Sequence, residues 1–270
     1  MPTQNFKLLG VEVAINLDDD HYGIDFWDKV ADRRYEPDTI NFIERECSDN
    51  SYFIDLGAAN GAITLVAALC KTNVLSVEPD PKMFEICRKN LELNKNYTQN
   101  VSIQNFAVSA KTGRVLFAKQ KNRKILSDIV FTGHDQTFTP TIQVMSLVDV
   151  ISRFHTNLAK KLVIKMDIEG AEWQILKNKE CLNSLKQHNA LMLLATHPGF
   201  YRPFQRKLRG LDFFRFKIWN YRNYRESKTV FNLISKHSRI FRTNMDSVIC
   251  NKSFANLIRA GYNEFIVDFR

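Results

Sequence analysis

The sequence has 270 residues, of which 44% are hydrophobic and 25% are charged, and this composition excludes a wholly disordered chain. The length fits one large domain, or a domain with an elaboration, and it allows a core that needs no disulfide bonds. The net charge of +9 is unevenly distributed. Residues 201–245 contain twelve Lys and Arg against two acids, so this basic block carries +10 while the rest of the chain carries −1.

The cysteines and apolar runs indicate a compartment. The five cysteines form no CxxC pair, so we expect reduced thiols and neither a disulfide framework nor a zinc site. The first twenty residues lack the basic region and long apolar run of a signal peptide. The longest apolar run, residues 62–70, is about half of a membrane span. We therefore expect a cytoplasmic protein.

Short apolar runs alternate with helical patterns along most of the chain. A strand or hairpin within 8–17 and a helical stretch ending near Cys47 are followed by expected strands at 52–56, 73–77, 101–106, 162–167 and 190–195. Helices are expected at 60–71, from Asp80, at 146–154 and from Ala171, with short strands over 113–144. A helix at 253–260 and a strand at 264–269 close the chain. This alternation predicts an α/β fold, a mostly parallel central sheet with helices on both faces.

The first expected strand ends in residues typical of a ligand-binding turn. Asp55 is followed by Gly57 and Gly61, and glycines allow a ligand to approach the backbone and the start of the next helix. In open parallel sheets, ligands bind outside the carboxyl ends of the strands. Ala59 stands where a dinucleotide fingerprint needs its middle glycine, and no P-loop motif is present. The pattern favours an adenosine ligand that carries a carboxylate but no pyrophosphate.

The second strand ends in an acid. Glu78 follows Gly57 by 21 residues, and an acid in this place can accept hydrogen bonds from ribose hydroxyls. The ordered set Asp55-x-Gly57-x-x-x-Gly61, followed by an acid after the next strand, is typical of class I S-adenosylmethionine-dependent methyltransferases. Either feature alone is weak, because turns need glycine and most glutamates are merely solvated.

Four stretches of the sequence narrow the resemblance from the class I methyltransferases to one family. Residues 53–61, 77–81, 105–109 and 164–172 resemble the FkbM family of methyltransferases, with a fainter similarity at Tyr35-Glu36-Pro37. The resemblance covers roughly residues 50–200. It implies a Rossmann-like methyltransferase fold with S-adenosyl-L-methionine as cofactor. It also implies O-methylation of sugars, glycan intermediates or related hydroxylated metabolites.

The cofactor residues follow from this pattern. We expect the turn after the first strand to hold the methionine end, with backbone N–H groups on its carboxylate and Asp55 on its ammonium. Glu78 would bind the ribose. Asn105 would meet the adenine edge with Phe106 stacking beside it, or these two are an ordinary loop Asn and core Phe. The expected cofactor-binding residues are Asp55, Gly57, Ala58, Asn60, Gly61, Glu78, Pro79, Asn105 and Phe106.

The catalytic candidates follow the fourth and fifth strands. Asp167 ends the fourth strand, Lys165 points to the same side, and His197 follows the fifth strand. We expect His197 to act as general base with Asp167 orienting it, which typically contributes 10²–10⁴-fold to a rate. The alternative is a divalent cation held by Asp167, His197 and Glu169. Glu172 is more readily explained by the favourable position of an acid at a helix N-terminus.

The domain organisation places the basic block directly after the fifth strand, beside the mouth of the site that the strand ends form. Residues 1–48 are an N-terminal strand and helix elaboration, 49–200 the cofactor-binding core, 201–250 a basic aromatic insertion acting as lid or acceptor-binding surface, and 251–270 the closing helix and strand. We expect the basic block to recognise an anionic small-molecule or glycan acceptor, such as a phosphorylated or nucleotide-linked sugar, or the membrane surface carrying it.

Two other functions use the same block differently. Its ten aromatic residues could stack bases, which would make the protein an RNA methyltransferase. Against this, no [DNS]PP[YFW] motif follows the fourth strand, and no cysteine nucleophile stands there, so nucleic acid is the less favoured partner. A non-catalytic membrane-surface or scaffold protein is the third alternative, and the intact cofactor pattern argues against it.

Overall fold

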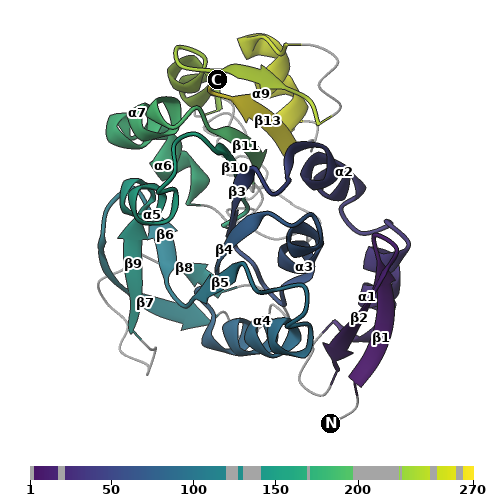
Figure 1. Ribbon diagram of the computed structural model, residues 1–270. Helices are drawn as coiled ribbons and strands as arrows, with labels where there is room; N and C mark the ends of the chain where they lie inside the picture. Colours follow the sequence, from purple (N-terminus) through teal and green to yellow (C-terminus); the bar gives the residue numbers. More distant parts are fainter. Residues whose placement is uncertain are drawn as a thin grey trace, which may run out of the picture.

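The computed structural model describes residues 3–17, 22–119, 127–129, 141–168, 171–196, 225, 227–243, 248–259 and 264–270 (Figure 1). The chain begins with an antiparallel hairpin of β1 (Thr3–Leu8) and β2 (Val11–Asn16), followed by α1 (Gly23–Ala31) and α2 (Pro37–Glu46). The hairpin begins at Thr3, earlier than the strand or hairpin expected within 8–17, and two helices stand where one helical stretch ending near Cys47 was expected. They lie along one side of the molecule (Figure 1).

A seven-stranded sheet forms the centre of the protein. Its strands are β3 (Ser51–Leu56), β4 (Asn73–Val77), β5 (Val101–Gln104), β10 (Lys161–Met166), β11 (Leu191–Ala195), β12 (Arg239–Phe241) and β13 (Glu264–Asp268). The order is β12-β13-β11-β10-β3-β4-β5, and only β13 runs antiparallel to its neighbours. The chain changes direction across the sheet between β3 and β10, which is where α/β sheets bind their ligands.

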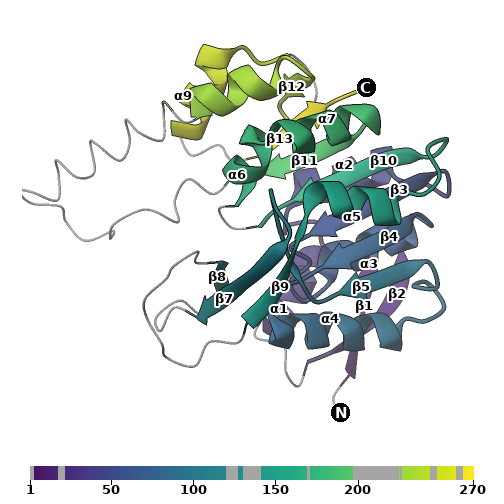
Figure 2. The same ribbon diagram turned by 90° about the vertical axis from the view of Figure 1, so that its left-hand side faces the viewer.

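Helices cover both faces of this sheet, as predicted. On one face lie α2, α3 (Ala62–Leu69) and α4 (Pro81–Leu93). On the other face lie α5 (Leu147–Phe154), α6 (Glu172–Lys177), α7 (Lys179–Gln187) and α9 (Asn251–Arg259), as Figure 2 shows. Side chains alternate along each strand, so Phe53 packs on the α2 and α3 side while Ile54 and Leu56 pack on the other.

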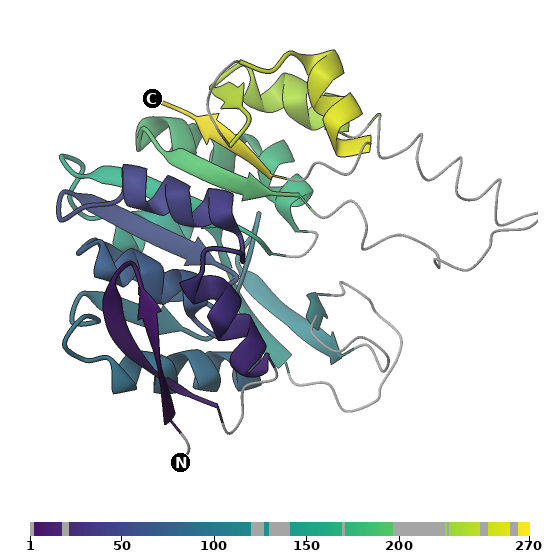
Figure 3. The same ribbon diagram turned by 90° about the vertical axis from the view of Figure 1, so that its right-hand side faces the viewer.

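A smaller sheet stands beside the carboxyl ends of the parallel strands. It contains β6 (Ala107–Ser109), β7 (Gly113–Lys119), β8 (Ser127–Ile129) and β9 (Thr141–Ser146) in the order β6-β9-β7-β8. In Figure 3 the arrowheads of the parallel strands point toward the side on which β7 and β8 lie. The strand expected over 101–106 ends at Gln104, where the chain leaves the central sheet, and a separate strand from Ala107 pairs with β9.

The described end of the basic block belongs to the core. Residues 227–234 are helical, and Val230 and Ile234 are fully buried in the main hydrophobic cluster. β12 then joins the sheet through β13. The division of the chain at residue 250 therefore falls between segments that share one core. The sequence pattern did not indicate α7 or β12.

Two further expectations concern cysteines and membranes. All five cysteines are free thiols, and Cys47, Cys87 and Cys181 are buried, whereas Cys250 is exposed. In the part of the chain that the structure describes, no helix combines the length and the apolar character needed to cross a lipid bilayer.

Candidate active site

The turn between β3 and α3 is shaped by two glycines. Gly57 has φ +89°, and a Cβ there would lie 1.9 Å from the carbonyl oxygen of Asp167. Gly61 has φ +88°, and a Cβ there would lie 2.6 Å from the Sγ of Cys87. Both positions need glycine for conformation and for space. The predicted glycine turn is therefore a close packing of backbone against the loop after β10 and against α4.

The N–H groups of this turn are bonded within the protein. Gly57 and Ala58 donate to the carbonyl oxygen of Val77 at 2.9 and 3.1 Å, and Gly61 donates to the carbonyl oxygen of Ala58 at 2.9 Å. Ala59, with φ +48°, donates to the side chain of Glu78. These bonds give the turn its shape before any ligand binds. None of these N–H groups is an open donor, and the proposed role of the turn in carboxylate binding stays a prediction.

Asp55 lies at the end of β3 and is fully buried. Its Oδ2 accepts a hydrogen bond of 2.8 Å from the hydroxyl of Thr64, so Ser76, whose hydroxyl lies 2.7 Å from that of Thr64, is the donor in the second bond. Oδ1 of Asp55 is buried and accepts no hydrogen bond from the described residues. Burial raises the pKa of this carboxyl. An unsatisfied buried oxygen of this kind suits a cationic or N–H-bearing ligand group.

Glu78 connects the loops that follow β3 and β4. It is only 6% exposed, and its two oxygens accept hydrogen bonds of 2.8 Å from the N–H groups of Ala59 and Asp80. Burial raises the pKa of Glu78 to about 7 even though these two N–H groups favour the ionised form. Each carboxylate oxygen has a second lone pair, so the predicted bonds to ribose hydroxyls are compatible with these contacts.

Asn105 and Asn60 shape the same loops. The side-chain amide of Asn105 donates to the carbonyl oxygens of Glu78 and Pro79 at 2.8 and 3.2 Å. Asn60 is 2% exposed, and its carbonyl oxygen accepts from the side chain of Asn90 at 3.0 Å. Phe106 is buried in the main hydrophobic cluster. The adenine contacts assigned to Asn105 and Phe106 remain predictions, and the packing of Phe106 fits the alternative of a core residue.

Lys165 and Asp167, two of the four catalytic candidates, form a partly buried ion pair. The Nζ of Lys165 lies 3.0 Å from Oδ2 of Asp167, and Lys165 is 4% exposed. Burial opposes the charge of the ammonium, but Asp167, Glu36 and Asp55 together raise the pKa of Lys165 well above its usual value. The group is therefore a permanent cation at the end of β10.

Two acids complete this region, and neither was among the predicted site residues. Glu264 begins β13 and pairs with Ala195 at the end of β11. Glu36 precedes α2 in a left-handed conformation with φ +41°, and its buried Oε2 has no hydrogen-bond partner among the described residues. The fainter FkbM similarity at residues 35–37 was a signal for Glu36. For Glu264 the sequence offered none, because an acid at the start of a strand is unremarkable.

The remaining catalytic candidates, His197 and Glu169, lie outside the described residues. Glu172 is 1% exposed and accepts a 3.2 Å hydrogen bond from the N–H of Ile168, which supports a structural role for it. Within the described ranges, no group of three His, Cys, Asp or Glu side chains is arranged to hold a metal ion. The divalent-cation alternative involved His197 and Glu169, so it stays a prediction.

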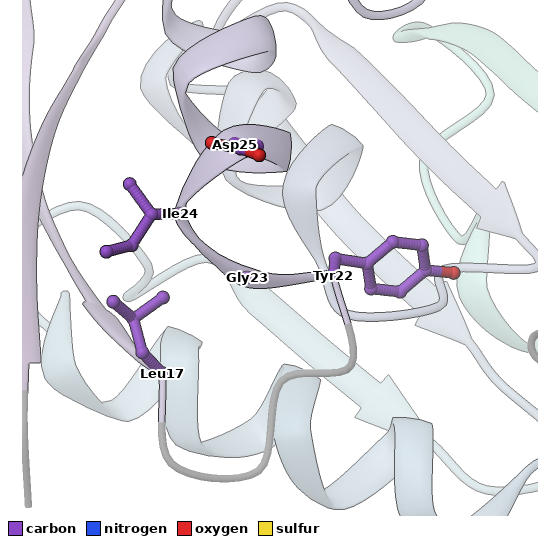
Figure 4. Close-up of a pocket in the computed structure, with 5 residues that line it drawn as sticks. All are labelled: Leu17, Tyr22, Gly23, Ile24 and Asp25. Atoms are coloured by element: carbon purple, nitrogen blue, oxygen red, sulfur yellow. The ribbon is translucent and has the colours of Figure 1, made fainter.

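A shallow pocket of about 400 Å³ opens at the start of α1 (Figure 4). Tyr22 borders it, with its ring 4.6 Å from that of Phe26, which is in turn 4.6 Å from the ring of Tyr35. These aromatic contacts link the pocket to the segment that carries Glu36. None of the predicted site residues lines this pocket. Its lining residues are Leu17, Tyr22, Gly23, Ile24 and Asp25.

The fold and these loops together define a class of protein. A mostly parallel sheet reverses its strand order between β3 and β10, and carboxylates stand at the ends of β3, β4 and β10. This is the architecture of a Rossmann-like domain that binds an adenosine cofactor. The sequence profile of the Methyltransferase FkbM domain matches residues 55–225, which is more than half of the chain. The chain belongs to the FkbM family of S-adenosylmethionine-dependent methyltransferases.

Several solved structures are similar to the chain. Cofactor-bound Rv0187 from MTB shares 11% identity with a TM-score of 0.42, covering 87% of this chain and 80% of that one. A putative caffeoyl-CoA O-methyltransferase from Staphylococcus aureus shares 11% identity with a TM-score of 0.41, covering 85% and 82%. P. horikoshii TYW2 in complex with MeSAdo shares 17% identity with a TM-score of 0.30, and the matched region covers 39% of this chain and 36% of that protein. No curated protein matches the sequence.

Proposed function

We propose that the protein is an O-methyltransferase that acts on a hydroxyl of a sugar, glycan intermediate or related hydroxylated metabolite. The observation that supports this most is the charged mouth beside the glycine turn. Lys165 and Asp167 lie at the end of β10, and Glu264 lies at the start of β13, two strands away. Carboxylates and an ammonium bind hydroxyl groups, and a carboxylate can also accept the hydroxyl proton. Among the described cysteines, the one at this turn, Cys87, is buried beneath Gly61 and cannot act as a nucleophile on the acceptor.

The chain's own residues fit the cofactor of the family. Bound S-adenosylmethionine supplies a methyl group activated by a sulfonium. Glu78 would hold the ribose, and the unsatisfied Oδ1 of Asp55 would meet the ammonium of the methionine end, directly or through water. Because the leaving group is already good, the protein's main contribution is to align the acceptor oxygen with the methyl carbon. The sequence predicts His197, oriented by Asp167, as the candidate for the general base, and the proposed function does not depend on which residue of the mouth takes this role.

The acceptor is proposed to be anionic, because the basic block follows β11 along the chain. Four cations of the block are chosen to test this, of which Arg225 lies in the described part of the chain and Arg215, Lys217 and Arg222 do not. Neutralising all four should weaken acceptor binding and reduce its salt dependence while leaving cofactor affinity unchanged. An equal loss of cofactor affinity would assign the block a structural role.

Calorimetric titration of S-adenosylmethionine tests the cofactor part of the proposal. The wild type should bind, and Glu78→Ala should bind much more weakly, because the ribose contact and the bridge between two loops are lost. Glu85→Ala on the exposed side of α4 is a matched control that should bind as the wild type does. Absence of binding to the wild type would overturn the proposed function.

A radioactive methyl-transfer screen tests the acceptor class. The panel contains phosphorylated sugars and nucleotide-linked sugars on one side and tRNA and rRNA transcripts on the other. Methylation of a sugar hydroxyl supports the proposal. Methylation confined to RNA would replace it with the alternative in which the basic block tracks a phosphate backbone.

A further inference from the structure

The strand register places Glu264 in line with the catalytic candidate on β10. Glu264 pairs with Ala195 at the end of β11. The residue next to Ala195 across the parallel pair is Asp167, and Gly57 follows on the end of β3, one step beyond the last registered pairs of these strands. One row therefore crosses four neighbouring strands at the carboxyl edge of the sheet. Since strands are about 4.8 Å apart, Glu264 lies two strands, or about 10 Å, from Asp167 along this row.

Side-chain alternation fixes the face on which this row lies. Ile266, two residues after Glu264, packs in the cluster that contains Leu193 and the α2 residue Ile40. Residues two apart on a strand point to the same face. Glu264 therefore faces the side covered by α2, and Glu36 stands at the start of that helix.

Glu264 differs from the other carboxylates of the mouth in its contacts. Asp55 is bonded to Thr64, and Glu78 accepts two backbone N–H groups. Asp167 is paired with Lys165. Glu264 is partly exposed and has neither a hydrogen bond nor an ion pair with any described residue. Asp55 and Glu36 also keep one oxygen each without a described partner, but those oxygens are buried. Glu264 is partly exposed, so an acceptor can reach its oxygens.

We propose that Glu264, held beside Glu36, accepts the proton of the acceptor hydroxyl during methyl transfer. This inference rests on the proposed O-methyltransferase function. The bond between the acceptor oxygen and the methyl carbon forms while the carbon–sulfur bond breaks, and the electron pair of that bond stays on sulfur. The hydroxyl proton passes to the Glu264 carboxylate and afterwards to solvent. A methyl ether and a neutral thioether result, so charge and atoms balance.

The charges around Glu264 suit this role. Burial and the neighbouring Glu36 raise the pKa of Glu264 to about 7, with Asp38 and Asp167 acting in the same direction and Lys165 opposing them. Asp38 is itself held by a 2.7 Å hydrogen bond from the hydroxyl of Thr243. A base with a pKa near the working pH combines an ionised ground state with a favourable proton transfer. Ordinary glutamates, with a pKa near 4.5, are weaker bases by more than two units.

The first test needs no acceptor. Carbon-13 NMR of labelled glutamate carboxyl groups should show a resonance titrating near pH 7 that Glu264→Gln removes and Glu78→Gln retains. Glu36→Gln should shift the titration midpoint of this resonance to lower pH, because a neighbouring negative charge is lost. Glu180→Gln, on the exposed side of α7, should change nothing. A Glu264 resonance that titrates below pH 5 would overturn the proposal.

The second test uses the acceptor that the sugar panel yields. Glu264→Gln should lower single-turnover methyl transfer by about 10²–10⁴-fold and abolish the limb of the pH–rate profile near 7, while S-adenosylmethionine still binds. An unchanged rate and profile, or loss of that limb in His197→Ala instead, would overturn the role of Glu264. Failure of the wild type to bind S-adenosylmethionine would overturn the proposed function itself, so the two failures are distinguishable.

Discussion

Lys165 and Asp167 are joined by an ion pair of 3.0 Å across two residues at the end of β10, on the face covered by α2. Lys165 is a cation surrounded by the carboxylates of Glu36, Asp55 and Asp167, and each of these carboxylates stabilises the positive charge of the ammonium. A single buried ammonium therefore makes it possible for several acids to stand together at this edge of the sheet.

Replacement of this cation should destabilise the folded protein more than the loss of a surface ion pair does. We expect Lys165→Met to lower the free energy of unfolding by about 3–5 kcal/mol, because Asp167 and Asp55 are left uncompensated in a buried site. Urea denaturation followed by circular dichroism measures this change. Asp32→Asn, which removes a solvent-exposed pair with Arg34, is the control and should leave the transition midpoint unchanged. Equal effects of the two variants would contradict the organising role of Lys165.

Gly57 and Gly10 separate two effects of a glycine. Both have positive φ, +89° and +83°, but a Cβ at Gly57 would overlap the Asp167 carbonyl, whereas nothing lies within 4 Å at Gly10. Gly10→Ala should cost about 1–2 kcal/mol for conformation alone. Gly57→Ala should cost a further 1–3 kcal/mol or so and should also weaken S-adenosylmethionine binding, because the loop after β10 must move. Thermal unfolding and calorimetry measure both, and similar losses in the two variants would argue against the close packing.

Glu78 should make stability depend on pH. Its folded pKa of about 7 lies above the ordinary value of 4.5 because of burial. The folded state then binds more protons than the unfolded state between these values, so this contribution is full below pH 4.5 and is lost as the pH rises through 7. Relative to Glu78→Gln, the wild type should lose about 3 kcal/mol of stability across this window. Urea titrations at half-unit pH intervals measure the slope, and parallel curves for the two proteins would refute the prediction.

A histidine pair at the opposite end of the sheet should make stability depend on pH in the opposite direction. Nδ1 of His155 lies 2.8 Å from Nδ1 of His188, and Nε2 of His155 lies 3.0 Å from the carbonyl oxygen of Lys160. A neutral His155 that donates from Nε2 must accept at Nδ1, so His188 donates from Nδ1. Burial and the neighbouring His155 lower the pKa of His188. Stability from this pair is thus complete above the unfolded pKa of about 6.5 and is lost as the pH falls below it.

Proton NMR of the imidazole rings measures this effect directly. The His188 signal should titrate at lower pH than in a peptide, and His188→Gln should flatten the fall in stability between pH 6.5 and 5. His237→Gln removes a histidine outside the pair and is the matched control. A His188 signal that titrates at or above the peptide value would refute the assignment of its neutral form.

The strand-end residues were predictable because local chemistry determines them. The apolar run before Asp55, the glycines after it and the Asp80-Pro81 start of α4 each follow from a short stretch of sequence, and Asp80 does cap α4 through the N–H of Lys82. The shapes of the loops were harder to predict from the sequence. The sequence indicated Glu78 as an acid after a strand, but its bond to Ala59 depends on how two loops meet.

The features that the sequence did not indicate are long-range. β6 pairs in parallel with β9, more than thirty residues later in the chain, and no local pattern specifies that partner. Glu264 reaches the mouth because β13 inserts beside β11. The sequence predicted a strand at 264–269 but could not predict which strands it would pair with.

The position of β13 has a consequence for how the protein is made. β13 is the last of the described strands along the sequence, yet it lies between β11 and β12, and among the described strands β12 pairs with β13 alone. During synthesis the sheet must therefore wait for residues 264–268 before either neighbour is fully paired. A chain truncated before these residues would expose the edge of β11, which is entirely apolar and a template for aggregation. Such a truncation would thus impair solubility before any change in catalysis could be measured.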